Sequence, residues 1–186
     1  MVRPAPDPRT HPLGDPTAVV REPLPTRFPP EEHIPALVTL LNGMLLWGGS
    51  RIYRARFGIG VNEWRILGEL SNIPGATAAR AGRDLGVNKA IVSRSIATLL
   101  EKGLIVQEAA GRARRLYLTG AGAALFDAVK PVAGTREQLL LDGFTEQEVA
   151  QLRAALVRMV ANGQGLRAFD DGMIVGGTGP GPDAQG

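Results

Sequence analysis

The chain has 186 residues, enough for one domain with a hydrophobic core and extended ends. It has no cysteine and two histidines, His11 and His33, which excludes disulfides and cysteine-zinc sites and leaves little material for a histidine base. No apolar run reaches the roughly 18 residues that cross a bilayer, and the first thirty residues lack the apolar segment of a signal peptide. We therefore expect a cytoplasmic protein that needs no cofactor and no metal.

Positive charge is concentrated in one segment. The formal net charge is only +3, but residues 77–119 carry eight basic and three acidic side chains, a net +5. Clustered positive charge favours a polyanionic partner such as nucleic acid. A solvated basic surface without a partner is the alternative at this point.

The two ends of the chain differ in composition from the middle. Residues 1–30 hold nine of the fourteen prolines, which remove backbone donors and disfavour helix, so we expect an extended or disordered arm. Residues 166–186 are rich in glycine and proline and are predicted to be a disordered tail. The folded part is then residues 31–165.

The first predicted helix covers residues 31–57. Two acids and a proline suit its first turn. Its apolar side chains recur at helical spacing: Ile34, Leu37, Leu41, Leu45 and Ile52.

Three shorter helices follow over residues 62–71, 78–85 and 89–102. Thr77 and Asn88 precede the second and third of these and are suitable N-caps, since their side-chain oxygens can accept a hydrogen bond from a free backbone N–H. A glycine follows each of these two helices, as is common at helix ends. Two helices joined by a short turn are typical of a helix-turn-helix.

A two-stranded ribbon is predicted next, with strands over residues 104–108 and 114–118 and a loop over 109–113. Helices then cover residues 119–140 and about 146–162, the latter opened by a capping box that begins at Thr145. The order predicts a mainly α fold with a small β-wing, namely a winged helix-turn-helix core with helical regions on both sides. We expect a DNA-binding lobe over about 61–119 and dimerisation helices over about 31–57 and 120–162.

The helix over residues 89–102 carries the strongest functional pattern. Val92, Ile96 and Leu99 fall on one side, where they can pack against the preceding helices. The opposite side is small, polar and cationic, which suits insertion into the major groove of DNA. That side consists of Lys89, Ala90, Ser93, Arg94 and Ala97. The alternative is the solvated side of an ordinary core helix.

The wing adds Arg112, Arg114 and Arg115. Arginines at a hairpin tip can reach the minor groove or the phosphate backbone. Arg114 and Arg115 are adjacent in a strand and point to opposite faces, so at most one of them can face DNA. A charged edge strand that prevents sheet-to-sheet association is the alternative.

Several motifs in this order resemble the MarR family of transcriptional regulators. They are Val61-Asn62-Glu63-Trp64-Arg65-Ile66-Leu67, then Leu85-Gly86-Val87-Asn88-Lys89-Ala90-Ile91-Val92-Ser93-Arg94, then Leu99-Leu100-Glu101-Lys102-Gly103-Leu104-Ile105, and finally Arg115-Leu116-Tyr117-Leu118-Thr119 with Gly122. The resemblance covers roughly residues 34–162. It implies a two-fold dimer built from the first and the last two helices, which binds near-palindromic operators.

The wing departs from the family pattern. The family carries Asp-x-Arg shortly before Leu-Thr, whereas this chain has Ala110-Gly111-Arg112. Without the acid to orient it, Arg112 is expected to make a looser or purely electrostatic contact. The full set of predicted DNA-binding residues is Thr77, Asn88, Lys89, Ala90, Ser93, Arg94, Arg112, Arg114 and Arg115.

The resemblance also implies a pocket for a small aromatic acid between the dimerisation helices and the DNA-binding lobe. The candidate lining residues are Met44, Trp47, Arg51, Trp64 and Arg65, since an arginine beside an aromatic ring can pair with a carboxylate. For the tryptophans and Met44 a place in the core is the alternative, and for the arginines a solvated position or an ion pair.

No nucleophile–base arrangement or glycine-rich phosphate loop is present, so an enzyme is not expected. The predicted function is a homodimeric, sequence-specific transcriptional regulator, in the first instance a repressor that a small aromatic ligand releases. Two alternatives stay open: a non-specific architectural DNA-binding protein, and a winged helix that serves protein interaction or dimerisation.

Overall fold

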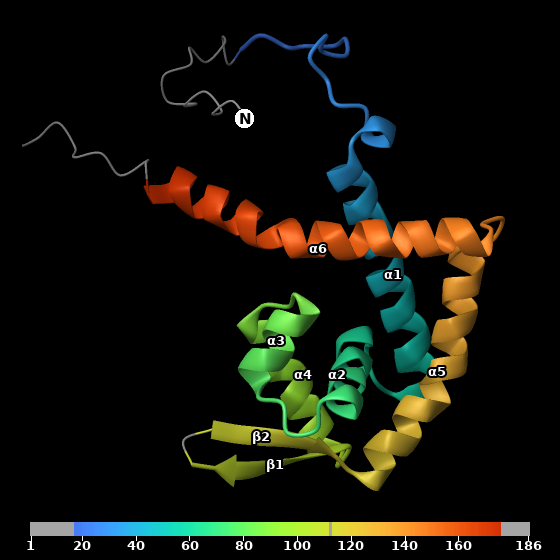
Figure 1. Ribbon diagram of the computed structural model, residues 1–186, viewed down its shortest axis with the longest axis vertical. Helices are drawn as coiled ribbons and strands as arrows, with labels where there is room; N and C mark the ends of the chain where they lie inside the picture. The colour runs from blue at the N-terminus through green and yellow to red at the C-terminus, as the bar shows by residue number, and fades with distance from the viewer. Residues whose placement is uncertain (1–16, 112, 176–186) are drawn as a thin grey trace, which may run out of the picture. The chain divides into compact units, whose positions relative to one another are not determined.

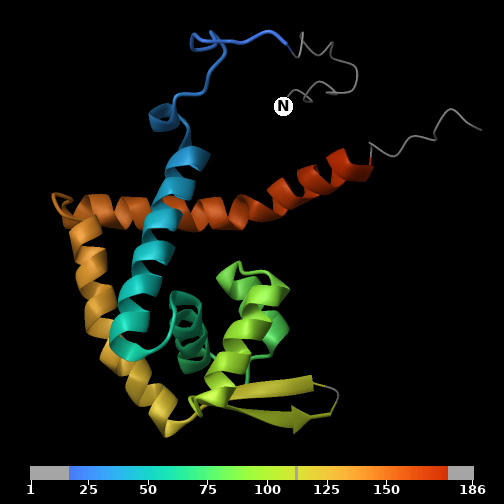
Figure 2. The same cartoon turned by 180° about the vertical axis from the view of Figure 1, so that it is seen from behind.

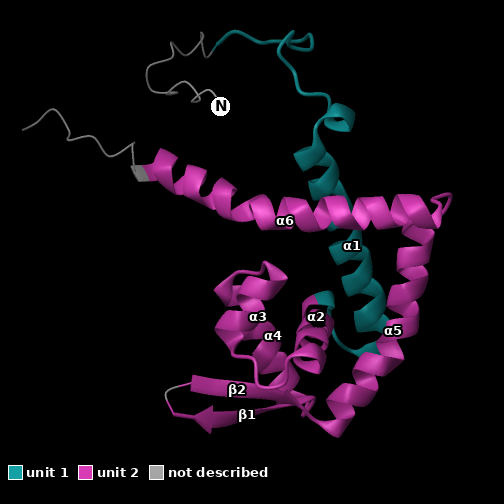
Figure 3. Cartoon of the chain, in the orientation of Figure 1, with its two compact units in different colours: residues 1–61 teal, residues 62–186 magenta. Residues whose placement is uncertain are grey.

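The computed structural model describes residues 17–111 and 113–175. It is mainly helical, with one two-stranded antiparallel sheet, as predicted (Figures 1 and 2). The chain divides into two units, Met1–Val61 and Asn62–Gly186 (Figure 3), and each is described by itself.

The first unit contains a short 3-10 helix, η1 (Pro30–Glu32), and a long helix, α1 (Ile34–Phe57). The predicted helix begins at residue 31, but in the structure the extended backbone of His33 separates η1 from α1. Pro35 fits the late start, because it has no N–H to donate to the Glu31 carbonyl, as a helix running on from residue 31 would require. Residues 17–29 form neither a helix nor a strand.

Within this unit the chain turns back at Gly58, whose left-handed backbone ends α1. Val61 then packs against Gly49, where an added Cβ atom would lie 3.2 Å from a Val61 methyl carbon. The Val61 N–H donates to the Ser50 hydroxyl oxygen at 3.4 Å. Gly49 therefore allows α1 and Val61 to approach closely, and a larger residue at this position would crowd Val61.

The second unit begins with the three short helices of the predicted core, α2 (Val61–Asn72), α3 (Ala78–Leu85) and α4 (Lys89–Glu101). Both predicted N-caps are confirmed: Thr77 accepts from the Arg80 N–H and Asn88 from the Ile91 N–H. In Figure 1, α3 and α4 lie together beside the two strands. Buried apolar side chains from each of these elements form the core, among them Ile66, Leu67, Leu70, Ala81, Val92, Ile96, Leu99, Ile105 and Leu116.

The wing consists of β1 (Ile105–Ala110) and β2 (Ala113–Leu118). Its register pairs Ile105 with Leu118 and Ala110 with Ala113, so only positions 111 and 112 connect the strands. The predicted loop over residues 109–113 is therefore wrong. The alanines on either side can adopt extended backbone, and Gly111 supplies the positive φ of a tight hairpin, +61°. Arg112 lies outside the described residues.

Two helices complete the second unit, α5 (Gly120–Leu140) and α6 (Glu146–Val175). The predicted capping box is confirmed, with Thr145 and Glu148 exchanging bonds at 2.8 and 3.3 Å. The predicted end of α6 near residue 162 is wrong, and residues 166–175 are helical instead of part of a tail. Glycines 163 and 165 cost roughly 1 kcal/mol each but do not stop the helix, and Leu166, Phe169 and Met173 continue its apolar periodicity.

None of the helices in the described ranges combines the length and apolar content needed to cross a membrane.

Candidate nucleic-acid interface

The α4 helix has one buried and one exposed side, as predicted. Val92, Ile96 and Leu99 are buried in the core of the second unit. The opposite side is exposed at every predicted position, which are Asn88, Lys89, Ala90, Ser93, Arg94 and Ala97. The exposed surface is narrow, because alanines flank the cationic and hydroxyl groups. A helix with such a surface can approach base edges closely.

The two N-cap residues offer less to a ligand than their side chains suggest. The Asn88 Oδ1 atom accepts the Ile91 N–H at 3.0 Å, and the Thr77 hydroxyl oxygen accepts the Arg80 N–H at 3.3 Å. A contact with DNA would therefore use the groups that the caps do not need, the Asn88 NH₂ and the Thr77 hydroxyl proton. The Thr77 cap fixes the start of α3, and the Asn88 cap fixes the start of α4.

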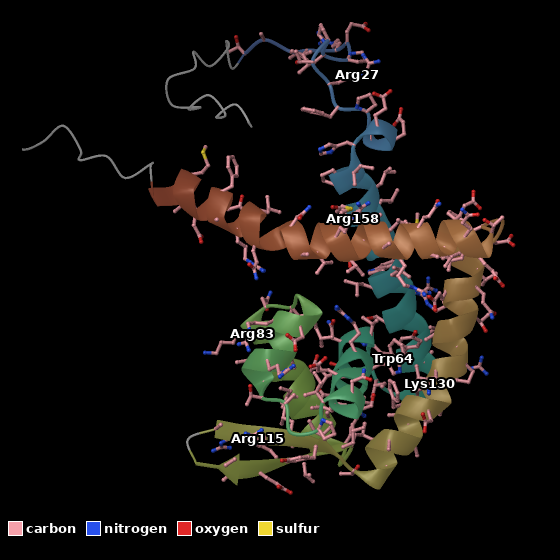
Figure 4. The ribbon with its side chains drawn as sticks, viewed as in Figure 1. Arg27, Trp64, Arg83, Arg115, Lys130 and Arg158 are labelled. Atoms are coloured by element: carbon pink, nitrogen blue, oxygen red, sulfur yellow. The ribbon has the colours of Figure 1, made fainter. Side chains whose placement is uncertain are left out.

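The two arginines of β2 differ in their partners. Arg115 donates to the Gly75 carbonyl at 3.3 Å, so its guanidinium is bound to the turn that precedes α3. Arg114 donates to the Gln107 side chain at 3.1 Å across the wing. The labelled Arg115 can be located on the wing in Figure 4. Both arginines thus have protein partners, Arg115 on the turn before α3 and Arg114 within the wing.

Backbone bonds hold the wing against the lobe. The Gly75 N–H donates to the Leu116 carbonyl at 2.9 Å, and the Leu116 N–H donates to the Ala76 carbonyl at 3.1 Å. The segment before α3 thus pairs with the outer edge of β2. This pairing fixes the wing relative to α3, and α3 packs against α4.

Thr119 ties the end of the wing to the end of α4. Its N–H donates to the Leu104 carbonyl at 3.1 Å, and its hydroxyl donates to the Gly103 carbonyl at 2.8 Å. The same oxygen caps α5 by accepting the Gly122 N–H at 3.0 Å. The motif formed by Leu118, Thr119 and Gly122 therefore joins the end of the wing to the end of α4 and caps α5.

Two carboxyl groups lie close together within the lobe, where Glu69 of α2 contacts Asp84 of α3. Partial burial raises the pKa of Glu69, and the neighbouring Asp84 raises it further, while Arg80 lowers it. Arg80 also forms an ion pair with Asp84 at 3.1 Å. The folded state therefore favours a proton on Glu69, and ionisation of Glu69 opposes folding.

We expect Glu69→Gln to stabilise the protein at pH 7 by about 0.5 kcal/mol, because the amide removes a like charge and can donate to Asp84. Because the folded-state pKa of Glu69 is raised, the charge on Glu69 destabilises the folded protein. This destabilisation develops as the pH rises from the unfolded-state pKa through the folded-state pKa. The stability gained by Glu69→Gln should therefore vanish below about pH 4. Urea unfolding across this pH range measures the effect, and Glu137→Gln makes the same substitution at an exposed position as a control.

Three of the candidate ligand residues belong to α1 and are open to solvent. Met44 is 59% exposed and Trp47 is 75% exposed. The Arg51 guanidinium lies over the Trp47 ring, 5.9 Å from its centre. Within the first unit, this part of the predicted set therefore forms an exposed cation–aromatic pair.

The other two candidates belong to α2 and have partners inside the second unit. Arg65 donates to the Leu85 carbonyl at 2.6 Å, and burial lowers its pKa. Trp64 stacks on Phe126 of α5 with a centroid distance of 5.9 Å, and Figure 4 shows Trp64 and Lys130 on neighbouring helices. The guanidinium of Arg65 is therefore already bound to protein.

Among the described residues, a broad open hollow of about 690 Å³ lies at the corner between α5 and α6. Leu141, Phe144 and Val149 form its apolar part, and Glu137 and Arg153 lie at its charged part. None of the five predicted ligand residues lines it. Sequence periodicity could not indicate this hollow, because it forms where the chain reverses between two helices.

The second unit is therefore a winged helix-turn-helix. One side of α4 is exposed, Thr77 and Asn88 cap α3 and α4, and backbone hydrogen bonds hold the wing against the lobe. The family model described as MarR family matches residues 57–116. No match was found among curated proteins.

Solved structures extend the likeness over most of the fold. A MarR/EmrR family regulator from Acinetobacter sp. ADP1 is 31% identical, with a TM-score of 0.69 over 74% of this chain and 99% of that one. A MarR family regulator from Silicibacter pomeroyi is 28% identical, with a TM-score of 0.66 over 72% and 92%. MepR from S. aureus, solved in a complex with DNA, shares the fold at 22% identity, with a TM-score of 0.61 over 71% and 97%.

This chain belongs to the MarR family of DNA-binding transcriptional regulators, which are not enzymes.

Proposed function

We propose that the protein is a homodimeric repressor that inserts α4 into the major groove at each half of a near-palindromic operator. The exposed small and cationic surface of α4 carries this proposal. Arg94 can donate to a guanine edge, Ser93 can bond to a base or a phosphate, and Ala90 and Ala97 permit close approach. The similarity to MepR, which was solved with DNA, supports the same use of the fold.

The dimer is supported by apolar side chains that a single chain leaves exposed. On α1 they include Ile34, Val38, Leu41 and Leu45, spaced three or four residues apart. On α6 they include Leu152, Leu156, Met159, Leu166 and Met173, also at helical spacing. Large exposed apolar patches mark interaction surfaces, and a second copy would remove them from water.

We expect the double substitution Leu152→Glu and Leu156→Glu to convert the dimer to a monomer and to weaken operator binding at least about 100-fold, since two linked half-sites bind far more tightly than one. Sedimentation velocity measures the mass, and fluorescence anisotropy measures the affinity. The control is Gln151→Glu with Asn162→Glu, which adds the same two negative charges at exposed polar positions of the same helix. A double-glutamate variant that stays dimeric would contradict this use of α6.

The proposal includes release from DNA by a small aromatic acid. Its support is the exposed pair of Trp47 and Arg51, which offers a ring and a cation for a carboxylate. Benzoic and hydroxybenzoic acids should raise the melting temperature and weaken operator binding. Arg51→Met should remove both effects, and an unchanged response in this variant would exclude Arg51 as the anion partner.

The test of the function is a gel shift of the full chain with the DNA upstream of its own gene. Specific binding should survive excess unrelated duplex and should weaken steeply with salt, as phosphate contacts require. An architectural protein would show no preference for the upstream DNA. A protein-interaction module would bind no duplex even at low salt.

A further inference from the structure

Three consecutive residues of α2 contact three different helices of the second unit. Glu63 accepts the Ser95 hydroxyl of α4 at 2.5 Å. Trp64 stacks on Phe126 of α5. Arg65 donates to the Leu85 carbonyl at the end of α3. We call Glu63, Trp64 and Arg65 the α2 junction.

The contact between Glu63 and Ser95 is a specific one. Ser95 is 3% exposed and is the buried polar residue on the packed side of α4, between Val92 and Leu99. A hydrogen bond from a hydroxyl to a carboxylate is short and strong, and it fixes both direction and distance. Apolar packing alone would let α4 rotate or slide on α2 by small amounts, whereas this bond selects one position.

The other two contacts set α3 and α5. The half-buried Arg65 guanidinium donates to the Leu85 carbonyl and so satisfies a free carbonyl at the end of α3. Phe126 also approaches Gly68, one turn beyond Trp64, where an added Cβ atom would lie 3.2 Å from its ring. The α5 helix thus lies directly against α2 at the level of the junction.

We propose that the α2 junction fixes the direction of α4 relative to α5 and thereby determines which half-site spacing the dimer accepts. This inference rests on the proposed operator-binding dimer, because α5 leads into α6, the proposed dimer helix. The α4 helix is about 20 Å long, so a rotation of about 10° moves its far end by about 3 Å. That displacement is close to the rise of one base pair, about 3.4 Å.

The experiment compares operators whose half-sites are moved apart or together by one base pair. The wild type should prefer its own spacing by about tenfold. Ser95→Ala and Phe126→Leu should bind that operator about tenfold more weakly and bind the altered operators within about threefold of wild type, so that the preference is lost. Glu63→Gln keeps an acceptor for Ser95 and should retain most of the preference.

A matched control is Ser71→Ala, which removes a hydroxyl from α2 whose bond is local, to the Gly68 carbonyl at 2.8 Å. It should leave the spacing preference unchanged. Equal weakening on all operators by the junction variants would show a purely structural role and would overturn the inference. Failure of the wild type to bind any operator would instead overturn the proposed function.

A second measurement does not depend on DNA. Because the chain has no native cysteine, Lys102→Cys places one spin label per protomer at the end of α4. The distance distribution between the two labels of a dimer should broaden or shift in Ser95→Ala and remain narrow in Ser71→Ala. Identical distributions in both variants would overturn the inference.

Discussion

Replacement of Gly122 by alanine is expected to destabilise the protein by about 3 kcal/mol, the upper range for overpacking of a well-packed site. An added Cβ atom would overlap the Leu104 carbonyl oxygen, and this neighbour is backbone. The same carbonyl accepts the Thr119 N–H that closes the lobe. Relief of the clash must therefore move α5 or break the connection between the wing and α4.

Gly120→Ala provides the matched control, because it makes the same change two residues earlier in α5 and meets no atom within 4 Å. It should be neutral or stabilising by about 0.5 kcal/mol, as alanine favours helix over glycine. Urea unfolding followed by circular dichroism gives both values. Equal stability of the two variants would mean that Leu104 and Gly122 are not in contact.

Arg94→Ala is expected to weaken operator binding by about 100-fold, since each copy loses a contact worth about 1–3 kcal/mol to a base pair and the dimer has two copies. Binding to unrelated duplex should weaken much less, because phosphate contacts by other cations remain. Fluorescence anisotropy with the operator and with a scrambled duplex of the same composition measures both changes.

Lys102→Ala is the control for charge alone. Lys102 is also an exposed cation of α4, but it lies at the C-cap, at the opposite end from Lys89. Its loss should reduce the two affinities by a similar, small factor. If Arg94→Ala also reduced both affinities equally, Arg94 would be a phosphate contact and the base-reading role would be lost.

Local signals were sufficient for most of the lobe. Thr77 and Asn88 cap the helices that the sequence predicts, and the exposed side of α4 follows from its apolar periodicity. The wing and the end of α6 were predicted wrongly because alanine and glycine were given too much weight. At the wing the alanines extend the strands, and in α6 the apolar periodicity continues past Gly163 and Gly165.

The partners of the site residues could not be predicted in the same way. Arg115 binds a carbonyl 40 residues away, Arg65 one that is 20 residues away, and Ser95 a carboxylate 32 residues away. Such contacts form only when three helices and the wing pack together, and the spacing of residues in the sequence does not predict that packing. The sequence predicted Arg115 as a DNA contact and Arg65 as a contact of a small ligand, and it could not indicate the backbone carbonyl to which each of them donates.

The most direct test of DNA recognition by the exposed side of α4 is selection of binding sites from a pool of random duplexes with the full chain. We predict enrichment of a two-fold symmetric sequence with half-sites about one helical turn apart. Guanines in those half-sites should be protected at N7 by the wild type and not by Arg94→Ala. Enrichment of no common sequence, or of one whose protected guanines are the same in both proteins, would contradict the account.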